Sequence, residues 1–164
     1  MKYVQRLSDS VYAIERILGI ILMVIMLGAI AAGVFFRYFL KSPLTWSDEL
    51  AIFMLVWVTF IGGSMSIKRQ QAAAVTLLYD RLSPMIRKMI LIVGFALTTI
   101  FSLYVAYLSF NWIMAPSVSM QMSPSLGITK FYVYLAIPVG FFCMGIHFFN
   151  FCLQSFSPIN KVEE

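Results

Sequence analysis

Two adjacent acids and one arginine are the residues best placed to do chemistry in this chain. Asp48 and Glu49 are the only neighbouring acids outside the C-terminal tail, and Arg37 precedes them by a short loop. An acid pair can serve acid–base catalysis, but no serine nucleophile constellation or glycine-rich phosphate loop accompanies it. We interpret the three residues as a charge cluster at the outer face that fixes a hairpin and docks a partner. The alternative is a helix cap, because the helix macrodipole favours acids in a first turn.

A line of large side chains runs on from this cluster at helical spacing. Trp46, Glu49, Phe53, Trp57 and Phe60 are separated by 3, 4, 4 and 3 residues, which places them on one helical face. Trp57 lies about two turns into the helix, at a depth where an indole N–H needs a partner. A face with this many aromatic residues beneath a carboxylate predicts an interface with a partner subunit.

Metal and cofactor chemistry finds little support in the residue types. His147 is the only histidine, which excludes a bis-histidine haem or a histidine-rich metal site. Cys143 and Cys152 are nine residues apart and form no CxxC pair. A lone histidine on an aromatic helix is more often a packed or interfacial side chain. We therefore expect no catalytic residue, no metal and no cofactor.

The composition places the chain in a membrane. Of its 164 residues, 61% are hydrophobic and 12% are charged, and the mean hydropathy is +0.88. Soluble domains are nearer ~45–50% apolar and ~25% charged. The net charge of +5 does not indicate nucleic-acid binding, because the basic residues flank apolar runs and form no patch. The first apolar run is longer than the ~7–15 residues of a signal-peptide core, so we expect the N-terminus to be retained.

Hydropathy divides the chain into four spans of a single all-α domain over residues 1–164. Residues 2–16 are expected to lie at the membrane surface before the first span, with Val4, Leu7, Val11 and Ile14 on one side. Pro138 predicts a kink in the last span, and residues 115–130 predict an external loop with its own shape. The predicted transmembrane helices cover 17–36, 48–67, 86–114 and 131–153, with a short amphipathic interfacial helix over 72–82.

Basic residues predict the orientation. With the N-terminus inside, nine lysines and arginines lie on the inner side and three on the outer side, so both termini are expected in the cytoplasm. No span has a charged residue at its centre, and Asn111, His147 and Asn150 lie towards span ends. A protein that conducts its own solute usually keeps such groups near the midplane. The four spans therefore favour a scaffold surrounded by membrane lipid over a solute pathway.

Two ordered stretches resemble a known family. The first runs from Arg37-Tyr38 through Trp46-x-Asp48-Glu49 to Trp57 and Gly62, and the second contains the segments SPSLGI (123–128) and YLAIPVGF (134–141). The combination is similar to the small membrane subunit of tripartite ATP-independent periplasmic (TRAP) transporters, the dicarboxylate-type, DctQ-like family. The residues that carry the resemblance are Arg37, Tyr38, Trp46, Glu49, Trp57, Gly62, Pro124, Gly127, Pro138 and Gly140.

The resemblance implies a role in a bacterial inner membrane complex. The subunit would scaffold a large membrane subunit that moves an organic acid by a sodium-coupled elevator motion, and a periplasmic substrate-binding protein would deliver the cargo. Overall likeness favours the sialic acid branch, with C4-dicarboxylates second. Family members often carry a histidine and an acid after the second span, where this chain has Ala72 and Thr76, so no role is carried over to that loop.

Two other classes remain as alternatives. A stand-alone four-helix multidrug exporter would need a membrane-embedded carboxylate. A membrane-bound enzyme would need a polar cluster at one face with a nucleophile or a metal set, and the residues around Asp48 contain neither.

Overall fold

The computed structural model describes residues 2–79 and 84–156, and this part of the chain is helical without a β-strand. Four of its helices are long and apolar enough to cross a membrane, which confirms the predicted fold class. One short helix lies between the third and fourth spans, and another forms the first turn of the fourth span. In chain order the helices are α1 (Lys2–Tyr38), α2 (Ser47–Tyr79), α3 (Pro84–Met114), α4 (Pro116–Ser119), α5 (Phe131–Tyr134) and α6 (Ala136–Ser155).

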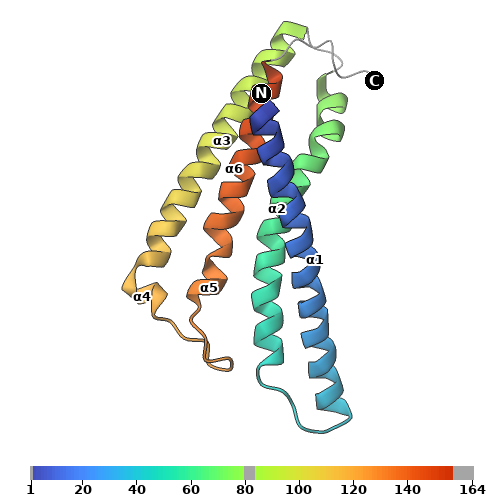
Figure 1. Ribbon diagram of the computed structural model, residues 1–164, viewed down its shortest axis with the longest axis vertical. Helices are drawn as coiled ribbons and strands as arrows, with labels where there is room; N and C mark the ends of the chain where they lie inside the picture. Colours follow the sequence, from blue (N-terminus) through green and yellow to red (C-terminus); the bar gives the residue numbers. More distant parts are fainter. Residues whose placement is uncertain (1, 80–83, 157–164) are drawn as a thin grey trace.

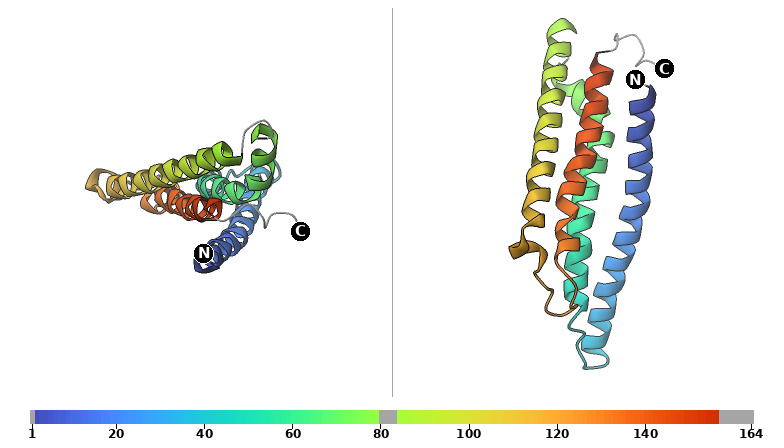
Figure 2. Two further views of the ribbon diagram at one scale, coloured as in Figure 1. Left: turned by 90° about the horizontal axis from the view of Figure 1, so that it is seen from above. Right: turned by 60° about the vertical axis from the view of Figure 1, so that its left-hand side comes forward.

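The long helices form an open layer with α6 in the middle. One face of α6 packs on α3 and another on α2, while α1 packs mainly on α2 at the other edge (Figures 1 and 2). In the most apolar stretch of the last span, Phe131–Ser155, 44% of the residues are buried, against 17–22% in the other three spans, because α6 contacts all three other long helices. We call the end that holds Lys2 and Ser155 the terminal end, and the end that holds residues 39–46 and 120–130 the hairpin end (Figure 1).

The first helix begins much earlier than the first predicted span. No proline lies before Pro43 and no glycine before Gly19, so nothing interrupts the helix between Lys2 and the apolar run. Its buried positions recur every seven residues, at Ser8, Glu15, Leu22 and Ala29. Two of these four are polar. The segment 2–16 belongs to α1 and turns Ser8 and Glu15 towards the other helices, and its expected place at the membrane surface stays a prediction.

The predicted interfacial helix over 72–82 is wrong as a separate element. Residues 72–79 are helical, but they continue α2, which runs without a break to Tyr79. The polar stretch after Lys68 and Arg69 consists of glutamines and alanines, which are good helix formers and contain no glycine or proline to end the helix. Residues 80–82 lie outside the described part of the chain.

The last span is broken near its beginning, as the proline predicted. The break lies at Leu135, between α5 and α6, three residues before Pro138. Pro138 has no N–H with which to bond the carbonyl of Tyr134, so the helix cannot run regularly through this turn.

Two glycines let helices approach closely. A Cβ placed on Gly33 of α1 would lie 3.2 Å from the Cβ of Ser47, and one on Gly140 of α6 would lie 2.7 Å from the Cβ of Phe60 on α2. Contacts this short leave no room for a side chain. The α1–α2 and α2–α6 packing therefore depends on glycine at these two positions.

Candidate functional site

The charge cluster is present at the hairpin end, with a different pairing for each acid. The Arg37 guanidinium donates to Asp48 Oδ2 at 3.0 Å, and both side chains are more than half exposed. Glu49, the next residue, turns towards another segment. Since an exposed ion pair contributes only about 0–1 kcal/mol, Arg37 and Asp48 help to orient the α1–α2 hairpin but hold it weakly.

Glu49 is the anchor of the outer loop, residues 120–130. Its Oε2 accepts a hydrogen bond of 2.9 Å from the backbone N–H of Ser125, 76 residues later. The loop has the shape of its own that was expected: Met122 and Thr129 form an antiparallel bridge, and Gly127 has φ +65°, a left-handed conformation that favours glycine. Glu49 thus ties the start of α2 to the connection between α3 and α6.

Trp57 also finds its partner inside this chain. The indole Nε1 donates to the carbonyl oxygen of Tyr132 at 3.0 Å. That carbonyl belongs to α5, beside the break in the last span. Backbone groups freed by a helix break at membrane depth need a protein partner, because lipid tails offer none. The predicted need of the Trp57 N–H for a partner is confirmed, and the partner is the distorted turn ahead of Pro138.

The rest of the aromatic face contacts the same helices. Phe53 is buried, and the Phe60 ring lies 6.1 Å from that of Phe141 and covers Gly140. Trp46, at the start of the face, stays 38% exposed. Most of this face therefore packs on α5, α6 and the outer loop of this chain, and its role as a partner-subunit interface stays a prediction.

The other residues of the family pattern divide between packing and surface. Pro138 and Gly140 are buried, whereas Tyr38, Gly62 and Pro124 are exposed. A Cβ on Gly62 would meet nothing within 4 Å. The side chains of Ala72 and Thr76 lie outside the part of the chain that can be described.

We predict that Trp57→Phe weakens the fold by about 0.6–1.7 kcal/mol, the range for an interhelical hydrogen bond in a membrane protein. The exchange keeps the ring but removes the N–H that donates to Tyr132. Reversible unfolding in mixed micelles would measure the loss. Trp46→Phe is the matched control, because Trp46 is partly exposed, and it should change stability less. Equal losses for the two variants would contradict the role of the indole bond.

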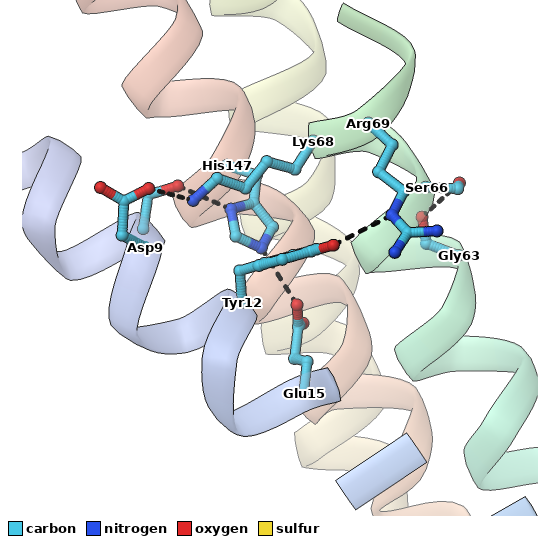
Figure 3. A network of polar contacts seen from close by, with 9 residues as sticks. Asp9, Tyr12, Glu15, Gly63, Ser66, Lys68, Arg69 and His147 are labelled. Carbon is cyan, nitrogen blue, oxygen red and sulfur yellow. Dashed lines mark hydrogen bonds and ion pairs between the residues drawn. The ribbon is translucent and has the colours of Figure 1, made fainter. Parts of the chain in front are cut away.

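A second polar network joins three helices at the terminal end (Figure 3). Lys68 of α2 forms an ion pair with Asp9 of α1, and its ammonium group lies 5.2 Å from the centre of the Tyr12 ring. Arg69 Nε donates to the Tyr12 hydroxyl at 2.9 Å. These four side chains form the solvent-facing part of the network and tie the start of α1 to α2.

The inner part of this network is the buried cluster of Ser8, Glu15 and His147. His147 Nδ1 lies 2.8 Å from Ser8 Oγ, and Nε2 lies 3.1 Å from Glu15 Oε2. Ser8 and His147 are fully buried and Glu15 is 4% exposed. Sequence reasoning expected His147 to be packed or interfacial but missed both partners. The available signal was the seven-residue recurrence that places Ser8 and Glu15 in line with Leu22 and Ala29.

The chemistry available to these clusters is structural. Across residues 2–79 and 84–156, no three His, Cys, Asp or Glu side chains are grouped to hold a metal ion. Glu49 is occupied by a backbone N–H, and His147 is bonded through both ring nitrogens. Both clusters instead join segments that are distant in the sequence, one at each end of the layer.

Comparison with known proteins agrees with this architecture. Residues 17–157 match the family "Tripartite ATP-independent periplasmic transporters, DctQ component". The chain is 28% identical to the C4-dicarboxylate TRAP transporter small permease protein DctQ of Rhodobacter capsulatus, over 70% of this chain and 51% of that protein. It is 24% identical to the ectoine TRAP transporter small permease protein TeaB of Halomonas elongata, over 88% and 74%.

A third relative is considerably longer than this chain. The match to the sialic acid TRAP transporter permease protein SiaT of Haemophilus influenzae is 27% identical and covers 85% of this chain but 21% of SiaT. This chain thus spans about half the length of the DctQ relative and a fifth of SiaT. Because the family match extends over most of the sequence, the chain belongs to the DctQ-component family of TRAP transporters.

Proposed function

We propose that this chain is a scaffold for a large membrane transport subunit and has no transport activity of its own. In the proposed complex the large subunit carries the solute in a sodium-coupled movement, and a periplasmic binding protein delivers it. The match within the longer permease protein SiaT supports a permanent membrane partner, because there a sequence like this one is part of a larger permease. No finding favours the multidrug exporter.

The observation that carries the proposal is the openness of the helix layer. In three of the four spans, at most 22% of the residues in the most apolar stretch are buried. Most of the apolar surface of these spans therefore faces lipid or another protein. The buried pair of Glu15 and His147 lies at the terminal end of the layer and is used in a contact between helices. A layer of this kind extends the membrane footprint of a partner without enclosing a path for a solute.

Contacts within the chain reduce the part of the predicted interface that is open to a partner. Phe53 is buried, and Trp57 and Phe60 contact α5 and α6, so a partner would meet this face mainly through Trp46 and the exposed Arg37–Asp48 pair. We infer that the large subunit docks at the hairpin end of α2. Exposed aromatic side chains beside charges are typical anchors of protein interfaces. The cytoplasmic position of both termini also stays a prediction, based on the nine-to-three distribution of basic residues.

The transported solute is the least determined part of the proposal. The two small-subunit relatives are named for C4-dicarboxylate and ectoine, and SiaT is named for sialic acid. Relatives at similar identity thus differ in solute, which is the expected pattern when this subunit does not bind it. We propose an organic acid, with sialic acid first and a C4-dicarboxylate second.

Reconstitution into liposomes tests the proposed function. The chain alone, under a sodium gradient, should take up neither sialic acid nor succinate, and uptake should appear when the large subunit and a loaded binding protein are added. Trp46→Ala should reduce capture of the large subunit while leaving this chain inserted. The Thr59→Ala variant, on the exposed face of α2, is the matched control. Sodium-driven uptake by this chain alone would overturn the scaffold role.

A further inference from the structure

The buried cluster of Ser8, Glu15 and His147 connects the two helices that otherwise share little surface. α1 packs along α2 for most of its length and meets α6 to a much smaller extent. Within that small contact, Nδ1 of His147 on α6 is hydrogen-bonded to Ser8 Oγ, and Nε2 is hydrogen-bonded to the carboxylate of Glu15 (Figure 3). The contact between α1 and α6 at the terminal end thus depends on an acid and an imidazole.

The charged groups around the cluster are paired elsewhere or exposed, so Glu15 and His147 have only each other to balance their charges. From α1, Asp9 pairs with Lys68 of α2, Tyr12 is bonded by Arg69, and Arg16 is exposed. From α6, the half-buried thiol of Cys143 lies near the Glu15 carboxylate. The second oxygen of Glu15, Oε1, is buried and accepts no hydrogen bond from the described residues. This oxygen is where a proton would be added.

The net charge of the pair depends on how many protons it holds. With one proton the pair is neutral overall, whether as carboxylate with imidazolium or as carboxylic acid with imidazole. A second proton leaves an imidazolium beside a neutral acid, which is one uncompensated positive charge in a site closed to water. Buried unpaired charge is strongly unfavourable, and water could solvate it if α1 moved away from α6.

We propose that Glu15 and His147 form an acid-sensitive latch between α1 and α6. One shared proton holds the latch closed, and binding of a second proton releases the terminal part of α1 from α6. Stability of the closed contact is therefore present while the pair holds one proton and is lost as the pH falls through the second protonation. This inference rests on the geometry of the cluster and is independent of the proposed scaffold function.

Distance measurements on the full chain in lipid nanodiscs test the latch. Spin labels would be placed on cysteines at Gln5 of α1 and Phe149 of α6, both exposed, in a Cys143→Ala, Cys152→Ala background. Between about pH 8 and about pH 4, a range that includes the ordinary titration of both imidazole and carboxyl groups, a population with a longer distance should appear reversibly. A distribution that stays unchanged down to about pH 4 would overturn the proposal.

The double variant Glu15→Gln, His147→Gln identifies the groups responsible. Two amides can hydrogen-bond across the same contact but take up no proton, so the longer-distance population should be lost at every pH. Asp9→Asn is the matched control, because it alters the neighbouring exposed pair with Lys68 and should leave the pH response intact. A double variant that responds to pH like the parent would assign the movement to other groups.

If the double variant fails to insert, infrared difference spectroscopy of the native chain tests whether a carboxyl group takes up a proton as α1 separates from α6. Acidification should produce the band of a protonated carboxyl group with the same pH midpoint as the change in distance. A band with a different midpoint, or none, would contradict release by protonation of Glu15.

Discussion

Replacing Glu15 by leucine is expected to destabilise the folded chain by about 3–5 kcal/mol, the cost of removing one partner from a buried pair. His147 is fully buried, so after the exchange its Nε2 has neither a carboxylate nor water to bond. Replacing both Glu15 and His147 by leucine should cost considerably less, because only the hydroxyl of Ser8 is then left without its partner. Reversible unfolding in mixed micelles would measure Glu15→Leu, His147→Leu and the double variant.

A double-mutant cycle on these residues separates pairing from packing. The double variant of Glu15 and His147 should lose less stability than the sum of the two single variants, and this coupling energy should exceed that between Asp9 and Lys68. Asp9 is 58% exposed, so its pair with Lys68 is expected to contribute about 0–1 kcal/mol. If the stability losses of the Glu15 and His147 variants were additive, the two side chains would act separately, and their contact of 3.1 Å would contribute nothing to stability.

Gly140→Ala is expected to cost about 1–3 kcal/mol through overpacking. The added methyl group would lie 2.7 Å from the Cβ of Phe60, an atom fixed close to the α2 backbone that cannot rotate away. The helices would have to separate and would disturb the nearby bond between Trp57 and Tyr132. Thermal unfolding in detergent, with the size of the purified particle as a second reading, would show the loss.

Gly62→Ala is the matched control for this position. Gly62 lies on the exposed side of α2, where a Cβ meets nothing within 4 Å, so alanine should leave stability unchanged or raise it by up to about 1 kcal/mol. A loss as large as that of Gly140→Ala would show that the effect comes from the loss of a helical glycine and not from the contact with Phe60.

The fold was largely predictable because a membrane span depends on the composition of one continuous segment. A run of about 20 apolar residues crosses a bilayer whatever its neighbours, so four such runs predicted the four long helices. The ends of the helices were less predictable. Residues 2–16 contain five charged side chains, and residues 70–79 follow Lys68 and Arg69 and begin with two glutamines, which suggested boundaries. Nothing in either segment breaks a helix, and α1 and α2 extend through them.

The candidate site divides in the same way. The spacing of Glu49, Phe53, Trp57 and Phe60 correctly grouped them on one face, since the periodicity of a helix is local. What that face contacts depends on Ser125, Tyr132 and Gly140, which lie 75 or more residues later. Part of the aromatic face therefore packs within this chain, and its contact with another subunit stays a prediction.

The buried cluster shows the limit most clearly. Ser8 and Glu15 lie 139 and 132 residues from His147, so no local pattern joins them. The apolar residues Leu7 and Ile14, expected on one side of a segment at the membrane surface, are 53% and 65% exposed. In a membrane protein the apolar side can face lipid, and the polar side then faces the protein.

The central position of α6 has a consequence for how this protein is made. The α1–α2 hairpin can pack as soon as both helices have left the ribosome, but α3 packs mainly on α6, which is synthesised last. Until then α3 has lipid or the insertion machinery as its neighbour, and the carboxylate of Glu49 and the indole of Trp57 have no loop or carbonyl to bind. A nascent chain that stops at Met114 would thus be a hairpin and a solitary helix, open to capture by quality-control proteases.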